Sequence, residues 1–181
     1  TAQNASYAQQ PYVLGIDPGL TGALAVVEIA TQRLVEVKRM PVKVIKKQNH
    51  LNGADLAQWF CDRVLERGNM RRADFLFAYV EAVHSRPRQA GQFNFGLNTA
   101  IVHGMLYANF IPFTLVQPQA WKAAYGIKRV GDEVKAAKKT EAREIAARLF
   151  PEMAHEFKRV KDDGVAEAAL IALYGANLLK G

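Results

Sequence analysis

Four acidic residues of this 181-residue chain stand among neighbours that are otherwise apolar or small. Asp17 ends a short apolar run just before a Pro-Gly turn, and Glu81 ends a second apolar run. Asp163 and Glu167 lie four residues apart at an Ala/Leu-rich segment, so they share one face if that segment is helical. A carboxylate in apolar surroundings is costly unless it is paired, hydrogen-bonded or bound to a metal. The four residues are therefore candidate metal ligands.

The chemistry open to such a set follows from its charge and its oxygen donors. Four carboxylates brought together repel one another and raise one another's pKa values unless a cation neutralises them. Carboxylate oxygens are hard ligands that suit Mg²⁺ or Mn²⁺. Two such ions roughly 4 Å apart can activate a water molecule and stabilise the leaving oxygen of a phosphodiester. The acidic set therefore predicts metal-dependent phosphodiester hydrolysis.

Each acidic residue also has a purely structural explanation. Asp17 could serve only its turn, Glu81 could be solvated at a strand end, and Glu167 could face solvent. Asp163 suits a helix N-cap or first turn, and the adjacent Asp162 could take either role in its place. All of these explanations would have to hold together to remove the site.

The charge of the chain favours a polyanionic partner without establishing one. Net charge is +7 and the pI is near 9.6, and Lys and Arg side chains bind phosphates with release of condensed counterions. Cys61 is the single cysteine, which excludes an internal disulfide, and its Trp59-Phe60 neighbours predict a buried, inert thiol. Without a secretory leader or an apolar run of the ~20 residues that a membrane span needs, we expect an intracellular protein.

The elements that must position these residues alternate along the chain. Apolar runs and period-two alternation predict strands at residues 12–17, 23–29, 34–40, 74–83 and 112–116. Helical periodicity and end signals predict helices at residues 54–66, 93–110, 118–125, 138–149 and 164–179. The short gaps between the first three strands predict an antiparallel meander, and the whole order predicts an α/β fold with a mixed sheet.

The remaining segments are predicted as connections. We interpret residues 1–11 as a flexible extension outside a single domain that spans residues 12–181. Residues 41–52 read as a basic, irregular connection that carries Lys43, Lys46 and Lys47. In the helix at 93–110, small residues recur every four positions and could pack in the core or in a dimer seam. We expect the core for this stripe of Gly96, Ala100, Gly104 and Ala108.

Three motifs, in order, resemble those of the RuvC-type Holliday junction resolvases of the RNase H-like superfamily. Residues 15–22 (GIDPGLTG) resemble the first-strand motif, residues 79–81 (YVE) the second acidic motif, and residues 161–172 (KDDGVAEAALIA) the acidic C-terminal helix. Residues 117–122 (QPQAWK) are similar to a further segment of phage, bacterial and chloroplast members. The first motif alone also resembles the phosphate loop of sugar kinases, actin and the Hsp70 group, which need two such domains and longer chains.

The resemblance implies a five-stranded RNase H-like mixed sheet flanked by helices and a two-metal active centre. Its ligands would be Asp17, Glu81, Asp163 and Glu167, with Mg²⁺ bound and Mn²⁺ able to substitute. It further implies a homodimer that resolves four-way DNA junctions by paired nicks, in recombination and repair. The location would be the cytoplasm or nucleoid for a bacterial or phage protein, or an organelle in a eukaryote.

Basic residues complete the predicted site. Lys122 and Lys139 fall near the family's basic residues beside the active centre, where a lysine can hold the scissile phosphate or stabilise developing charge. We expect Lys122 to act in catalysis as well as in DNA binding. Further candidate DNA contacts are Lys138, Arg86, Arg88, Lys128 and Arg129.

The chain departs from the family at its last motif. Many bacterial members space the final acidic pair three residues apart, whereas Asp163 and Glu167 are four apart, a form closest to phage-like and chloroplast members. Glu167 in place of the usual Asp lengthens that arm by one methylene. Two alternative functions stay open, a broader nuclease of branched or flap DNA and a non-catalytic junction-binding protein.

Overall fold

The structure, a computed structural model, describes residues 12–66, 75–82, 92–127 and 135–181. The predicted N-terminal extension at 1–11 lies outside the described residues, and the division into this extension and one domain stays a prediction. None of the helices in the described part of the chain combines the length and apolar composition that a membrane span requires.

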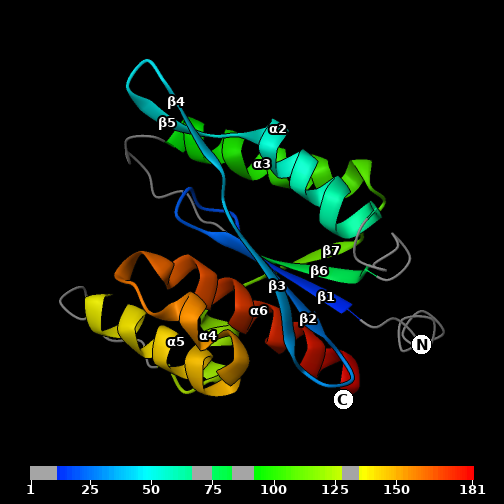
Figure 1. Ribbon diagram of the computed structural model, residues 1–181, viewed down its shortest axis with the longest axis vertical. Helices are drawn as coiled ribbons and strands as arrows, with labels where there is room; N and C mark the ends of the chain where they lie inside the picture. The colour runs from blue at the N-terminus through cyan, green and yellow to red at the C-terminus, as the bar shows by residue number, and fades with distance from the viewer. Residues whose placement is uncertain (1–11, 67–74, 83–91, 128–134) are drawn as a thin grey trace.

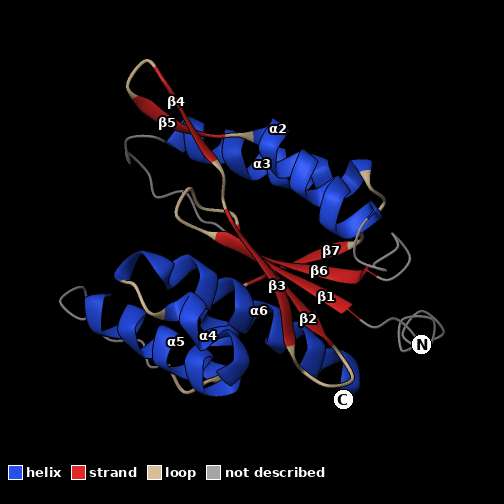
Figure 2. Cartoon of the chain, in the orientation of Figure 1, coloured by secondary structure: helices blue, strands red, loops and turns tan. Residues whose placement is uncertain are grey.

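A five-stranded mixed sheet forms the centre of the molecule (Figures 1 and 2). Its strand order is β3-β2-β1-β6-β7, with antiparallel pairing among β1, β2 and β3 and parallel pairing of β1 with β6 and of β6 with β7. The strands are β1 (Tyr12–Asp17), β2 (Ala23–Glu28), β3 (Leu34–Arg39), β6 (Phe75–Glu81) and β7 (Phe113–Val116). This confirms the predicted α/β class, the meander and the mixed sheet.

Helices cover both faces of the sheet, with α2 and α3 on one face and α4, α5 and α6 on the other (Figure 1). The helical elements are α2 (Gly53–Trp59), the π-helical η1 (Phe60–Glu66), α3 (Gln92–Ala108), α4 (Pro118–Ala124), α5 (Lys135–Leu149), the 3-10 helices η4 (Pro151–Phe157) and η5 (Val160–Asp162), and α6 (Asp163–Lys180). Two apolar clusters result. Val13 belongs to the one under α5 and α6, and Leu14 and Ile16 to the one under α2 and α3, as the period of a strand dictates.

Helix α6 packs closely against β1 because Gly15 has no side chain. A Cβ at Gly15 would lie 2.3 Å from both the carbonyl oxygen of Ala168 and the backbone nitrogen of Ala172. Van der Waals contact needs a separation well above 3 Å, so any larger residue would push the helix and the strand apart. The close approach fixes the height of α6 over the central strand.

Three predictions were wrong in detail. Residues 41–52 are not irregular: β4 (Val42–Ile45) and β5 (Gln48–Leu51) form an antiparallel hairpin. The small-residue stripe of α3 is exposed rather than in the core, and a Cβ added at Gly96 or Gly104 would meet no neighbouring atom within 4 Å. Cys61 is half-buried rather than buried. These errors have one physical reason. The sequence pattern of a segment does not show which of its surfaces another part of the chain will cover.

Candidate functional site

Two of the four predicted acidic residues meet at one edge of the sheet. Asp17 and Glu81 end β1 and β6, which are parallel neighbours, and the register pairs Ile16 with Val80 immediately before them. Parallel strands end at the same sheet edge, so the two carboxylates leave the sheet side by side. Oδ1 of Asp17 accepts a hydrogen bond of 3.0 Å from the backbone N–H of Gly19, which holds the side chain at the turn.

The N-terminal end of α6 lies over the turn that follows β1. A Cβ at Gly164 would lie 2.1 Å from the carbonyl oxygen of Thr21, so only glycine allows this contact. Asp163 and Glu167 are one helical turn apart on α6 and therefore come close to the sheet edge that carries Asp17. The predicted helix thus brings Glu167 to the place where Asp17 and Glu81 end their strands.

Electrostatic repulsion shows that three of the carboxylates share a small region. Burial first, and then the charges of Glu167 and Glu81, raise the pKa of Asp17 from 3.8 to about 7. Burial and the charge of Glu167 also raise the pKa of Glu81. Asp17, Glu81 and Glu167 therefore form one half-buried, strongly negative cluster, which we call the carboxylate cluster.

Helix α4 supplies a cation and a hydrogen-bond donor to this cluster. Nζ of Lys122 lies 3.3 Å from Oε1 of Glu167. The positive charge of Lys122 counteracts part of the rise in the pKa values of Asp17 and Glu81. The fully buried Trp121 donates from Nε1 to Oε1 of Glu81 at 3.0 Å. Lys122 was predicted at the site from the sequence. Trp121 was not, and its place in the same short motif was the only signal that could have found it.

The neighbouring acids Asp162 and Asp163 have different partners. Asp162 is fully buried, and hydrogen bonds from Arg159 and Arg39 hold its pKa at about 2 although burial by itself acts to raise it. Asp163 forms an ion pair with Arg143 of α5, with 2.9 Å between Oδ1 and Nε but without the alignment of a hydrogen bond. Asp162 thus anchors η5 to β3, and Asp163 is the acid that faces α5.

The carboxylate cluster fits a hard divalent cation in its chemistry. Three half-buried carboxylates with one lysine leave excess negative charge, which adds to the effect of burial in raising the pKa values of Asp17 and Glu81. Mg²⁺ and Mn²⁺ prefer such oxygen donors. As the side chains stand, however, no group of three or more His, Cys, Asp or Glu in the described residues is arranged so that it could hold one ion.

Most of the predicted basic contacts cannot be placed. Arg86, Arg88, Lys128 and Arg129 lie outside the described residues. Lys138 and Lys139 belong to α5, but only their backbone is described. Lys122 is therefore the predicted basic residue whose position beside the carboxylate cluster is known.

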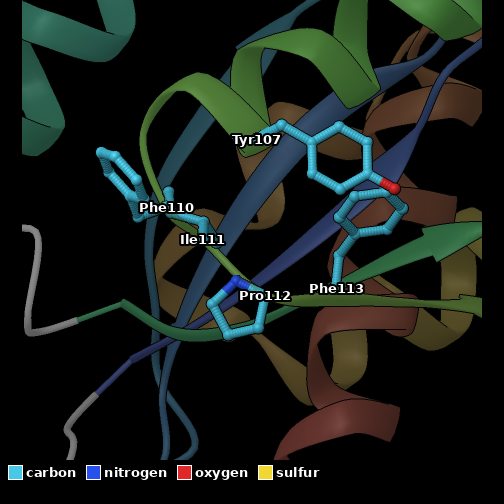
Figure 3. A pocket seen from close by; sticks show the side chains of 5 residues that line it. All are labelled: Tyr107, Phe110, Ile111, Pro112 and Phe113. Carbon is cyan, nitrogen blue, oxygen red and sulfur yellow. The ribbon is translucent and has the colours of Figure 1, made fainter.

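A separate apolar pocket lies at the opposite edge of the sheet from the carboxylates (Figure 3). Its volume is about 570 Å³, and it is lined by Tyr107, Phe110, Ile111, Pro112 and Phe113, from the end of α3 to the start of β7. The rings of Tyr107 and Phe113 lie 5.1 Å apart between their centroids. Because β7 is parallel to β6, the start of β7 and the end of β6 are at opposite edges, and the pocket is no part of the carboxylate cluster.

The sheet order, with its meander and two parallel strands, defines an RNase H-like fold, and the chain is similar to solved structures of that fold. RuvC of Thermus thermophilus in complex with Holliday junction substrate aligns with a TM-score of 0.62 and 20% identity, over 94% of this chain and 96% of that one. A second T. thermophilus RuvC structure aligns with a TM-score of 0.55 and 21% identity, over 91% and 95% of the two chains. The yeast mitochondrial Holliday junction resolvase Ydc2 aligns at 0.49 and 19%, over 98% and 85%.

Comparison by sequence gives no further relatives, since neither a known family model nor a curated protein matches the chain. The two alignments with T. thermophilus RuvC span nearly the full length of both chains. The chain has the RuvC fold, as the resemblance of its motifs implied.

Proposed function

We propose that this protein is a divalent-metal-dependent endonuclease that resolves four-way DNA junctions by paired nicks, in recombination and repair. The observation that carries the proposal is the carboxylate cluster, in which Asp17, Glu81 and Glu167 repel one another beside Lys122. The similar fold of T. thermophilus RuvC, a protein solved with a Holliday junction substrate, supports the choice of DNA. The positive net charge of the chain agrees with a polyanionic substrate.

Asp17, Glu81, Asp163 and Glu167 would hold the metal, Mg²⁺ by preference with Mn²⁺ as a substitute. The bound metal would supply an activated water and neutralise charge at the scissile phosphate. Trp121 fixes the orientation of Glu81 through its hydrogen bond. Lys122 balances the cluster in the absence of metal and can turn to the phosphate when Glu167 is engaged.

Asp163 needs one further change to act as a ligand. Its ion pair with Arg143 holds the carboxylate toward α5. A metal ion would compete with the guanidinium for the same oxygen atoms. In this proposal Arg143 neutralises the buried Asp163, which could hold a metal ion only if this ion pair opened.

Paired nicks require two active centres, and the exposed face of α3 offers a way to bring two copies together. The face, which we call the α3 face, consists of small residues between larger apolar ones: Phe93, Gly96, Leu97, Ala100, Gly104 and Tyr107. Phe93 is 83% exposed and Tyr107 69% exposed, unusual values for aromatic side chains on a helix. Small residues let two helix backbones approach closely, so we assign this face to the homodimer contact.

The proposed function is tested by nicking of a synthetic four-way junction with and without Mg²⁺. We expect mapped, symmetric cuts that disappear in Asp17→Asn, while junction binding survives because phosphate contacts dominate affinity. Asp55→Asn is the matched control, since Asp55 is an exposed acid whose salt bridge with Lys38 lies outside the cluster. Full Mg²⁺-dependent cleavage by Asp17→Asn would refute the mechanism.

The same assay separates the two alternatives. Equal rates on junction, flap and linear duplex would favour a broader nuclease. Tight binding without nicking in Mg²⁺ or Mn²⁺ would favour a non-catalytic junction-binding protein. An intracellular location, in the cytoplasm, nucleoid or an organelle, goes with each of these readings.

A further inference from the structure

The β4–β5 hairpin is a basic projection that the carboxylate cluster does not use. It extends from the body of the molecule on the side of α2 and α3 (Figure 1). Every residue of β4 is exposed, as are Lys46 and Lys47 at the tip. The segment 40–54 contains three lysines and no acidic residue. The hairpin therefore carries only positive charge on its lysine side chains.

The tip has the backbone of a tight two-residue turn. Lys46 and Lys47 both have positive φ, of 47° and 64°, and they join the pair Ile45 and Gln48. Positive φ at both central residues is the requirement of a type I′ turn, for which Asn-Gly is the easiest sequence. Here two long cationic side chains occupy positions that favour small ones, so the turn presents two charges side by side.

Strand β5 of the hairpin is fixed to α3 at both of its ends. The backbone N–H of Leu51 donates to Oδ1 of the buried Asn98 at 3.2 Å, and Nδ2 of Asn94 donates to Oε1 of Gln48 at 3.4 Å. The backbone N–H of Asn52 closes the base on the carbonyl of Pro41 at 2.7 Å. These hydrogen bonds fix the orientation of the hairpin relative to α3.

The hairpin begins at the sheet edge that carries the carboxylate cluster. Asp17 pairs with Ala23, and Ala23 pairs with Arg39 at the end of β3. Two strand spacings separate Asp17 from Arg39, roughly 10 Å. From Met40 to Lys46 six steps of extended chain add at most ~20 Å, so the tip lies at most ~30 Å from Asp17, about nine base-pair steps of duplex DNA.

We propose that the hairpin is a second DNA-binding element, in which Lys46 and Lys47, with Lys43 on the adjoining strand, contact backbone phosphates of one duplex arm. This rests on the proposed function, because it takes the substrate to be branched DNA cut at the carboxylate cluster. Charge complementarity argues for DNA over a second copy of the chain, which carries the same positive net charge. The contact lies up to about nine base pairs from the cut and is independent of DNA sequence, since lysine–phosphate contacts do not read the bases.

The test compares the salt dependence of junction binding in three variants. Lys46→Asn with Lys47→Gly removes two charges and installs the preferred turn, so its thermal stability should equal or exceed that of the wild type. Lys46→Arg with Lys47→Arg keeps both charges. Arg33→Gln with Lys180→Gln removes two exposed charges at the other end of the sheet and serves as the matched control.

We expect the Asn-Gly variant to lower the slope of log K against log [NaCl] by about 1.8 for two lost phosphate contacts. Its affinity deficit relative to the wild type is then about 12-fold larger at 50 mM than at 200 mM NaCl. The Arg-Arg variant and the control should keep the wild-type slope. Junctions with arms shorter than about nine base pairs should reduce the difference between the Asn-Gly variant and the wild type.

Three outcomes overturn the proposal: an unchanged slope in the Asn-Gly variant, an equal loss in the matched control, or a change in sedimentation that places the hairpin in a contact between two copies. Wild-type nicking measured in parallel separates this proposal from the proposed function. If the wild type neither binds nor nicks the junction, the proposed function fails. If it does both and the Asn-Gly slope is unchanged, only the hairpin assignment fails.

Discussion

Nζ of Lys122 lies 3.3 Å from Oε1 of Glu167, so the carboxylate cluster contains its own cation. The lysine also lies over the ring of Trp121, with 4.8 Å between Nζ and the ring centroid. Trp121 in turn holds Glu81. Helix α4 therefore neutralises one carboxylate, orients a second and counteracts part of the rise in the pKa of Asp17.

Substitution of Lys122 is expected to reduce catalysis more than binding. Lys122→Met removes a charge that can stabilise the scissile phosphate, and the loss of one such group typically costs 10²- to 10³-fold in rate, so we expect about that loss. The measurement is single-turnover nicking of a four-way junction in Mg²⁺, with Kd measured in parallel. Lys122→Arg, which keeps the charge, should recover part of the rate. A Lys122→Met protein with the wild-type rate would exclude this role.

Arg143→Gln tests whether Asp163 is a metal ligand. Arg143→Gln removes the ion pair between Arg143 and the buried Asp163, and the loss of one such pair lowers stability by at most ~3 kcal/mol. We expect a lower Tm without metal and a larger gain in Tm on addition of Mg²⁺ than in the wild type, because the ion no longer competes with the guanidinium. Thermal unfolding across a Mg²⁺ titration provides the measurement. Equal Mg²⁺-induced gains in the two proteins would remove Asp163 from the ligand set.

A charge placed on the α3 face should separate the dimer. Gly104 has open space around it, so Gly104→Arg is accommodated in the monomer but blocks close approach of a second helix. We expect the sedimentation coefficient of a monomer and a change of product on a cruciform plasmid from linear DNA to nicked circles. Ala30→Arg, at an exposed turn far from α3, is the control and should stay dimeric. A dimeric Gly104→Arg protein would place the contact elsewhere.

His103 on α3 is expected to make stability depend on pH. Burial lowers the pKa of His103 below its usual 6.5, so between the two values the unfolded chain binds more protons than the folded one. The free energy of unfolding therefore rises with pH through this window and falls as the pH drops below 6.5. Urea unfolding at pH 5 to 8 should show a weaker pH dependence in His103→Gln than in the wild type. Parallel curves for the two proteins would contradict the assignment.

The sequence was sufficient to predict those features whose geometry follows from the spacing of residues within one segment. The apolar runs that end at Asp17 and Glu81 predict buried strands, and parallel neighbours necessarily end at one edge of a sheet. The α/β class and the mixed sheet followed from the order of such runs. Asp163 and Glu167 were placed on one helical face by spacing alone, and that helix is observed.

Only the tertiary structure decided which surfaces are covered and which charges are paired. Helix α3 is apolar nearly all round, so its sequence could not say that Gly104 faces outward. The hairpin was missed because its strands are exposed and its turn is Lys-Lys rather than Asn-Gly. Asp162 and Asp163 are adjacent acids, and their partners come from β3, from α5 and from the residue before η5, up to 123 positions away. Electrostatic energy depends on distance in space, which the order of residues along the chain does not contain.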